Sequence, residues 1–393
     1  MKRILSIDRG SSSIKFAVYE IGAAHEQRVL VGGVEPLGAA NATVRICDER
    51  GADPQETRRL LGDAKPVAAL LGLLHELGVN FDAVGHRLVY GGLAHEAPAR
   101  VTTELMASLA KLVPFDPLHM PDALATIHEI ETALPNLPQA VCFDTAFHRR
   151  MPAVAQRLPL PRELWSEGIR RFGFHGLSYE SIVRGLGEEG TRGRMIVAHL
   201  GNGASLAAMQ DGRPVDTTMG LSPLGGIMMG TRPGDLDPGV LLYLLREGRY
   251  KPAELDEVLT QRSGLLGVSH ISADVRTLLA RRADDVAAAE AIELFVYLAK
   301  KSIGALAAVL GGLDTLVFTG GIGEHAPVIR WEIADGLAYL GVKLDPARNA
   351  AGAAVISAND VGVIARVIAT NETLMVARHA WTTLFSASVN ARR

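Results

Sequence analysis

The sequence has little of several features that would place it in other classes of protein. Only two cysteines occur among its 393 residues, Cys47 and Cys142, which excludes a disulfide framework and suits a reducing compartment. No apolar run reaches the ~20 residues that cross a bilayer, and no secretory signal follows Met1. Basic and acidic side chains number 40 and 43, without the basic excess of nucleic-acid-binding proteins. We therefore expect a cytoplasmic protein with neither nucleic-acid nor membrane partners.

Glycine is the residue in excess. The chain contains 41 glycines, gathered in short clusters such as Gly91-Gly92 and Gly320-Gly321, where the average protein has ~7%. Such clusters mark places where the backbone turns sharply or approaches a ligand closely. The other proportions, 48% apolar and 21% charged, are typical of a globular protein, and the length predicts two domains.

One local pattern occurs twice. Strands are predicted at 3–7 and 14–19 around a Gly/Ser turn, and again at 195–198 and 206–209 around a second Gly/Ser turn. Gly10 and Gly201 lie 191 positions apart, about half the chain. This repetition indicates an internally duplicated protein with two facing domains.

Strands and helices alternate between these landmarks, which is typical of an α/β fold. The patterns predict strands at 83–89 and 315–318, with a helix start at Asp237-Pro238. They also predict helices at 66–78, 121–134 and 284–310. We expect one domain of residues 1–147 plus 374–393, whose last helix packs back on it, and a second domain of residues 148–373.

The first Gly/Ser turn is suited to an anion, because it offers backbone N–H groups and the hydroxyls of Ser11 and Ser13. Asp8 is placed to hold a metal ion beside that anion, and Lys15 is placed to reach a phosphate. An ordinary tight hairpin is the alternative. The Gly-x-x-x-x-Gly-Lys-Ser/Thr phosphate loop does not occur.

Four charged side chains stand among apolar and turn residues. Arg87 and Asp144 follow predicted strands, His175 precedes a predicted helix, and Arg232 lies in the loop before Asp237. Taken singly, each also fits a surface ion pair or a packing role.

Taken together, the blocks resemble the acetate and propionate kinases across nearly the whole chain. The blocks are Gly-Ser-Ser-Ser-Ile-Lys (10–15), Gly-His-Arg (85–87), Pro-Leu-His (117–119), Phe-Asp-Thr-Ala-Phe-His (143–148), Gly-Phe-His-Gly (173–176), His-Leu-Gly-Asn-Gly-Ala-Ser (199–205), Met-Met-Gly-Thr-Arg (228–232), Thr-Gly-Gly-Ile-Gly-Glu (319–324) and Thr-Asn-Glu (370–372). The resemblance implies a duplicated actin-like (ribonuclease H-like) ATPase fold, with two domains flanking a nucleotide cleft, and a homodimer. It also implies ATP/ADP and Mg²⁺, or Mn²⁺, as cofactors.

The resemblance further implies a set of site residues. Catalysis falls to Asp144, His175 and Arg232, and the metal to Asp8 and Glu372. The acetate site would consist of Arg87, Val89, Leu118, His119, Phe174 and Pro223. The nucleotide site would consist of Ser11, Ser13, Lys15, His199, Leu200, Gly201, Asn202, Gly203, Asp274, Val275, Arg276, Gly321, Ile322, Gly323, Glu324 and His325.

Alternatives stay open at this point. A propionate or other short-chain carboxylate kinase fits equally well, since one methylene changes binding by only ~1–3 kcal/mol. A non-catalytic nucleotide-binding protein would not need Arg87 and Arg232, and a sugar kinase would use Asp144 as a base. Asp8 stands where the family usually has asparagine, and His325 also departs from the usual asparagine, which leaves the phosphoryl donor open.

Overall fold

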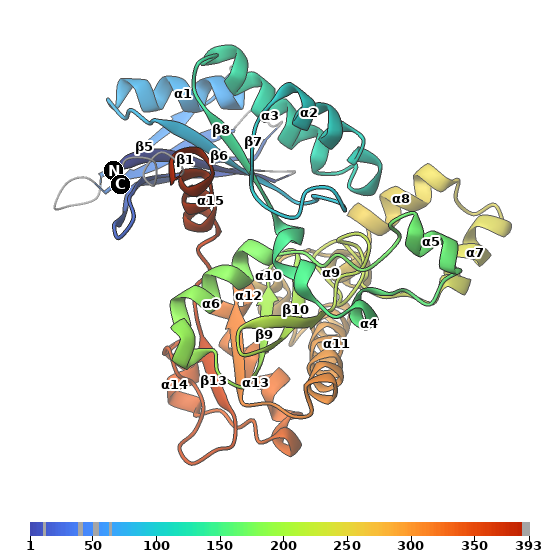
Figure 1. Cartoon of the computed structure of the whole chain (residues 1–393). Helices are drawn as coiled ribbons and strands as arrows, with labels where there is room; N and C mark the ends of the chain where they lie inside the picture. The colour runs from blue at the N-terminus through green and yellow to red at the C-terminus, as the bar shows by residue number, and fades with distance from the viewer. Residues whose placement is uncertain (11–12, 38–41, 50–54, 63–64, 387–393) are drawn as a thin grey trace. The chain divides into compact units, whose positions relative to one another are not determined.

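The computed structural model describes all residues except 11–12, 38–41, 50–54, 63–64 and 387–393 (Figure 1). The chain forms two compact units. Unit 1 consists of Met1–Ala146 with Asn371–Arg393, and unit 2 consists of Phe147–Thr370. The chain therefore passes between the units twice, after Ala146 and after Thr370.

Unit 1 contains an eight-stranded sheet in the order β5-β4-β3-β2-β1-β6-β8-β7. Strand β1 pairs antiparallel with β2 and parallel with β6, and β6 pairs parallel with β8. The strands are β1 (Lys2–Arg9), β2 (Ile14–Ile21), β3 (Glu26–Glu35), β4 (Thr43–Asp48), β5 (Gln55–Leu60), β6 (Ala83–Leu88), β7 (Ala99–Arg100) and β8 (Gln139–Phe143).

Unit 2 repeats the central part of this topology. Its five-stranded sheet has the order β11-β10-β9-β12-β13, with β9 antiparallel to β10 and parallel to β12. The order and strand directions match β3-β2-β1-β6-β8 of unit 1. The predicted duplication is thereby confirmed. The strands are β9 (Arg194–Leu200), β10 (Ala204–Gln210), β11 (Arg213–Thr217), β12 (Thr315–Thr319) and β13 (Ile364–Val367).

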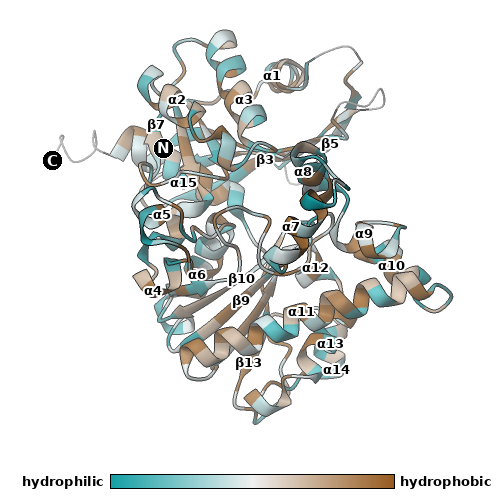
Figure 2. Ribbon diagram, turned by 90° about the vertical axis from the view of Figure 1, so that its right-hand side faces the viewer, coloured by the Kyte–Doolittle hydropathy of each residue, from teal (hydrophilic) through white to brown (hydrophobic). Residues whose placement is uncertain are grey.

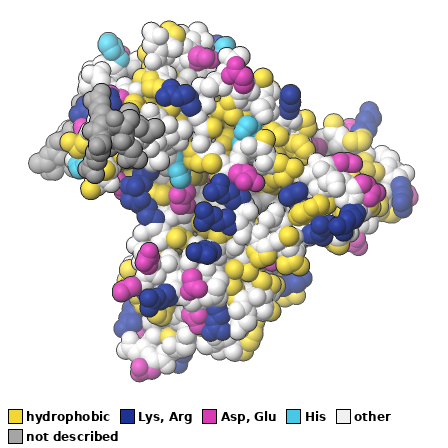
Figure 3. Space-filling model, viewed as in Figure 1, with side chains coloured by type: hydrophobic (Ala, Val, Ile, Leu, Met, Phe, Trp, Pro, Cys, Tyr) yellow, Lys and Arg dark blue, Asp and Glu magenta, His cyan; other side chains and the backbone are white. Residues whose placement is uncertain are grey.

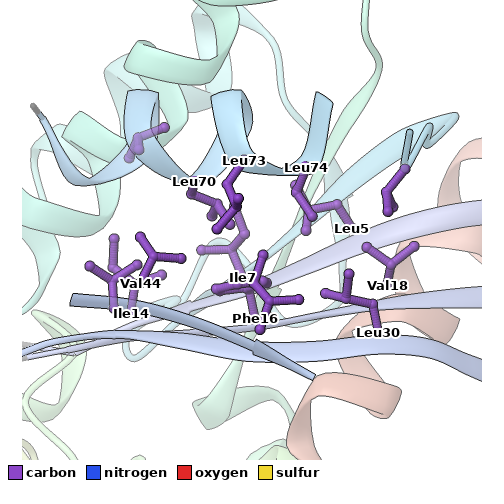
Figure 4. Packing of buried hydrophobic residues seen from close by; sticks show 14 of the residues in the cluster. Leu5, Ile7, Ile14, Phe16, Val18, Leu30, Val44, Leu70, Leu73 and Leu74 are labelled. Carbon is purple, nitrogen blue, oxygen red and sulfur yellow. The ribbon is translucent and has the colours of Figure 1, made fainter. Parts of the chain in front are cut away.

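Helices cover both faces of the unit 1 sheet. Leu70, Leu73 and Leu74 of α1 (Pro66–Glu76) point toward Ile7 and Phe16 of the sheet (Figure 4). On the other face, α15 (Glu372–Trp381) lays its small buried residues against β1 and β8. Burial of such apolar side chains, ~1.5–3 kcal/mol each, holds the strand ends in place.

The unit 2 sheet is covered in the same way. Tyr179 and Ile182 of α6 (Gly176–Gly190) pack against β9, β10 and β12. The long helix α11 (Val286–Leu310) contacts β9, β10 and β11, and its alternating brown and teal patches in Figure 2 reflect an amphipathic helix.

The remaining helices are short and are distributed over both units. They are α2 (Thr103–Ala110), η1 (Val113–Phe115), α3 (Met120–Ala133), η2 (Asp144–Arg150), α4 (Ala153–Gln156), α5 (Arg162–Ser166), α7 (Pro238–Arg246), α8 (Pro252–Gln261), α9 (Gly264–Ser269), α10 (Val275–Arg281), α12 (Gly320–His325), α13 (Pro327–Asp335), η3 (Ala338–Leu340), α14 (Pro346–Ala350) and the π-helical turn η4 (Thr382–Ser386).

The predicted elements are confirmed, with shifts of a few residues at their ends. Asp237 caps α7 by accepting a hydrogen bond from the Gly239 N–H, and Pro238 occupies the first helical position. The glycine-rich stretch after β12 differs from expectation, because it forms the short helix α12 instead of an open edge. The C-terminal helix predicted to reach residue 387 continues through η4 to Ser386, and residue 387 lies outside the described residues.

The surface agrees with the balanced composition. On the face drawn in Figure 3, Lys and Arg side chains are interspersed with Asp and Glu side chains. Cys47 and Cys142 form no disulfide. Among the described residues, every helix is too short or too polar to span a bilayer.

Candidate active site

Three charged residues of unit 1 meet because they end neighbouring strands. Asp8 of β1 is the register partner of Arg87 of β6, and Asp144 directly follows β8, the next parallel strand. The carboxyl ends of parallel strands lie at one edge of a sheet, where ligand sites of α/β proteins form. Glu372, the first residue of α15, adds a fourth charge to this edge.

The Arg87 guanidinium binds all three carboxylates. Its Nη1 donates to Asp8 Oδ1 at 2.7 Å and its Nη2 to Asp144 Oδ2 at 2.5 Å. Its Nε donates to Asp144 and lies 3.4 Å from Glu372 Oε2. These contacts engage Nε and one N–H on each of Nη1 and Nη2. Because a guanidinium carries five N–H groups, one N–H on each Nη remains for a further acceptor.

Electrostatics divides these carboxylates into two kinds. Burial raises the pKa of Asp8, but Arg87, Lys15 and His119 outweigh burial and leave that pKa below its ordinary value. Burial and the nearby charges of Asp8 and Asp144 raise the pKa of Glu372 to about 7, against the attraction of Arg87. Glu372 is therefore the carboxylate that a proton or a cation neutralises near neutral pH.

The raised pKa of Glu372 predicts a pH-dependent stability that Glu372→Gln removes. Between pH 4.5 and 7 the unfolded chain has released this proton while the folded chain retains it, so stability falls as the pH rises, by about 3 kcal/mol in total. We expect Glu372→Gln to match the natural protein in urea unfolding at pH 5 and to be more stable at pH 8.

The matched control is Glu76→Gln, an exposed glutamate paired with Arg59 whose pKa is lowered. That variant should show no difference from the natural protein that grows between pH 5.5 and pH 8. A stability difference for Glu372→Gln that stays constant over the same range would contradict the assignment.

The Gly/Ser turn of unit 1 is held by one backbone hydrogen bond, from the Gly10 N–H to the Ser13 carbonyl at 2.8 Å. Lys15 of β2 is the register partner of Asp8, and its side chain is exposed. Ser11 lies outside the described residues. In unit 2 the Gly201 N–H donates to the Gly203 carbonyl at 3.1 Å, so both hairpins are tight turns.

The predicted nucleotide segments of unit 2 line one pocket. Three stretches that are far apart in the sequence enclose about 510 Å³, a volume suited to a small organic ligand. The predicted residues in the lining are Gly201, Asn202, Asp274, Val275, Arg276, Gly321, Ile322 and His325. His199, Leu200, Gly203, Gly323 and Glu324 belong to the same segments without lining the pocket.

Side-chain hydrogen bonds hold the pocket segments. Glu324 Oε1 accepts from the backbone N–H groups of Gly320 at 3.0 Å and Thr370 at 3.2 Å, which ties the start of α12 to the end of unit 2. Asp274 caps α10 through the Arg276 N–H. The buried Arg330 donates to the carbonyls of Gly323 and Glu324. The pocket wall is therefore fixed from behind.

His175 and Arg232 converge on Gly203 within unit 2. A Cβ atom on Gly203 would lie 2.8 Å from Arg232 Nη2 and 3.2 Å from His175 Nε2, so only glycine leaves room for both donors. Arg232 Nη1 donates to the Pro223 carbonyl at 2.7 Å. His175 has a left-handed backbone, with φ 57°, a conformation that clusters at functional sites.

The predicted acetate-site residues belong to both units. Val89, Leu118 and His119 lie in unit 1 with Arg87, and His119 Nδ1 is 2.9 Å from Asp116 Oδ1. Phe174 and Pro223 lie in unit 2 and are buried.

Sequence reasoning missed the residues that hold His175. His148 is buried and its pKa is lowered to about 4, so its neutral ring donates from Nε2 to the Phe174 carbonyl at 2.9 Å. Ser205 Oγ lies 2.8 Å from His175 Nδ1 and 2.5 Å from the Tyr179 hydroxyl. Both His148 and Ser205 stand in blocks singled out by their sequence, which was the available signal.

Comparison with known proteins agrees with this arrangement. The profile of the acetokinase family matches residues 3–378. The acetate kinase of Rhodopseudomonas palustris is 47% identical, over 96% of this chain and 97% of its own length. A propionate kinase structure from Francisella tularensis superposes with a TM-score of 0.89 at 34% identity, covering 96% of this chain and 99% of that one. The acetate kinase structure from Porphyromonas gingivalis gives 0.84 at 34% identity, covering 98% and 100%. The chain belongs to the acetokinase family.

Proposed function

We propose that this protein is an acetate kinase, which transfers the γ-phosphoryl group of ATP reversibly to acetate and yields acetyl phosphate and ADP. The observation that carries the proposal is the unit 2 site, where three separate segments line one pocket and two cationic or polar donors, Arg232 and His175, meet beside it at Gly203. The acetate kinase relatives, similar over almost their full length, support the choice of reaction.

The chemistry needs alignment and charge neutralisation more than it needs a base. Acetate is already ionised at neutral pH, and phosphoryl transfer passes through a loose transition state with charge on the phosphoryl oxygens. We assign the acetate carboxylate to the remaining N–H groups of Arg87, and the phosphoryl oxygens to Arg232 and to His175 Nε2. Asp144 is fully buried and bound to Arg87, which suits an organiser of that guanidinium and not a proton acceptor.

Mg²⁺ is proposed as the resident metal, held by Asp8 and Glu372, with Mn²⁺ as a substitute. Their hard carboxylate oxygens suit this cation, and the raised pKa of Glu372 reflects a site short of positive charge. Among the described residues no three His, Cys, Asp or Glu side chains form a metal site by themselves. That fits a Mg²⁺ site completed by nucleotide phosphates. When bound, the ion would neutralise phosphate charge.

The proposal is tested by coupled ADP release with four acceptors. We expect turnover with acetate to exceed that with propionate, butyrate and glycerol. Efficient use of propionate would favour the alternative suggested by the Francisella tularensis relative, a propionate kinase. Turnover only with glycerol would indicate a sugar-type kinase, and no turnover with any acceptor despite ATP binding would indicate a nucleotide-binding protein.

We also propose a homodimer, and α7 supports it. This helix is apolar over most of its length, yet none of its residues is buried. Val240, Leu242 and Tyr243 have 45%, 49% and 59% of their surface exposed. An exposed apolar patch of this kind marks a protein interface, and a second copy of the chain is the partner we assign to it.

Leu242→Glu is expected to convert a dimer to a monomer, because it places a charge in an apolar interface. Light scattering coupled to gel filtration measures the change. Leu60→Glu, on the exposed strand β5, is the matched control and should remain dimeric. A natural protein that is monomeric at micromolar concentration would contradict the dimer proposal. With its unpaired cysteines and an ATP substrate, the protein is placed in the cytoplasm as part of this proposal.

A further inference from the structure

We propose that Ser205 and Tyr179 are positioning residues that fix the proton of His175 on Nε2, the nitrogen that faces Gly203. The inference rests on the role that the proposed function gives to His175 as a donor to the phosphoryl group. It adds two residues, from β10 and α6, whose hydroxyls reach the reaction through the imidazole and not by contact with the substrate.

The three side chains form a continuous chain of hydrogen bonds. The Tyr179 hydroxyl lies 2.5 Å from Ser205 Oγ, and Ser205 Oγ lies 2.8 Å from His175 Nδ1. Tyr179 and Ser205 are completely buried, so water does not compete for these bonds. The His175 ring also stacks on the His199 ring, with centroids 4.3 Å apart, which fixes its plane.

The direction of the chain follows from the strengths of its donors and acceptors. A phenol, with a pKa of ~10, is a much better donor than an aliphatic hydroxyl, and a neutral imidazole nitrogen is a better acceptor than either oxygen. The bonds therefore run from the Tyr179 O–H to Ser205 Oγ, and from the Ser205 O–H to His175 Nδ1. Because Nδ1 accepts, the proton of the neutral ring sits on Nε2.

This proton points to the place where it is needed. His175 Nε2 would lie 3.2 Å from a Cβ atom on Gly203, next to the Nη2 group of Arg232. With the opposite tautomer, Nε2 would present a lone pair to phosphoryl oxygens and repel them. The serine and tyrosine hydroxyls thus decide whether His175 is a donor at the proposed phosphoryl site.

Nitrogen NMR of the protein labelled with ¹⁵N-histidine reads the tautomer directly, with His175→Gln used to assign the signal. In the natural protein we expect a protonated Nε2 and an unprotonated Nδ1 for His175. In Ser205→Ala and in Tyr179→Phe, the two nitrogen shifts should move toward each other as the second tautomer becomes populated. Unchanged His175 shifts in both variants would overturn the proposal.

Kinetics provides the second readout. We expect Ser205→Ala to lower kcat about tenfold, the worth of one hydrogen bond, while the KM for ATP changes less than twofold. Tyr179→Phe, which removes a single oxygen and should preserve the fold, should have a smaller effect in the same direction. A raised KM for ATP with an unchanged kcat would contradict the positioning role.

The matched control is Thr126→Ala, which removes a buried hydroxyl from α3 of unit 1 and should leave both readouts unchanged. The two proposals also fail differently. If the natural protein transfers no phosphoryl group to acetate, the proposed function is wrong, whereas the NMR shifts still report whether Ser205 and Tyr179 hold the proton on Nε2.

Discussion

Arg232→Ala is expected to lower the turnover of acetate phosphorylation by about 10³- to 10⁵-fold, the range measured for arginines that neutralise a transferring phosphoryl group. The backbone around Arg232 is firmly held. Its carbonyl accepts from the Met229 N–H at 2.9 Å, and the Thr231 hydroxyl donates to the Thr260 carbonyl at 2.9 Å. The substitution therefore removes a charge at a fixed position without releasing the loop.

The loss should fall on kcat and leave ATP binding largely intact, because the residues of the 510 Å³ pocket are unchanged. Coupled ADP release measures turnover, and calorimetry measures the Kd of ATP. Arg232→Lys should recover only part of the rate, since an ammonium group is a point charge without the planar fork of a guanidinium. Arg262→Ala, an exposed arginine after α8, is the control and should stay within twofold of the natural rate. Near-normal turnover of Arg232→Ala would refute its proposed role.

Much of the fold could be predicted because its signals are local. Two Gly/Ser hairpins half a chain apart predict the repeated sheet, and the pair Asp237-Pro238 predicts the start of α7. The placement of Arg87 and Asp144 near strand ends likewise predicts that both lie at one sheet edge. Strand β5 escaped prediction because nearly all of its residues are exposed, so it carries no alternating pattern and joins the sheet through backbone pairing with β4.

The partners of the site residues could not be predicted, because they depend on contacts between distant segments. The residue resemblance assigns Arg87 to the substrate, but it does not reveal that the same guanidinium binds three carboxylates from β1, η2 and α15. Equally, nothing in the block that contains Ser205 indicates that its hydroxyl meets His175, which lies 30 residues earlier. The exposure of α7 is also invisible, since an apolar helix normally predicts a buried one.

Arg87→Ala should destabilise the protein as well as inactivate it. A residue that only held acetate would raise the acetate KM and leave stability unchanged. Here the substitution removes the one guanidinium that neutralises Asp8, Asp144 and Glu372, whose side chains have at most 16% of their surface exposed. Leaving buried carboxylates without their partner costs about 3–5 kcal/mol. Urea unfolding at pH 8 measures this loss.

The loss should shrink as the pH falls. Without Arg87 the pKa values of the three carboxyl groups rise further above those of the unfolded chain, so protonation at low pH relieves their repulsion. We expect the gap to the natural protein to be clearly smaller at pH 5 than at pH 8. Arg59→Ala, which breaks an exposed pair with Glu76, is the matched control and should show no such trend.

A double-mutant cycle separates charge compensation from other effects of truncation. If Arg87 stabilises unit 1 by neutralising carboxylates, adding Glu372→Gln to Arg87→Ala should restore part of the stability at pH 8, because one of the uncompensated charges is gone. The activity should not return, since the donor assigned to acetate is still missing. Additive losses in the double variant would show that Arg87 and Glu372 act independently, and the proposed charge balance of this site would then be wrong.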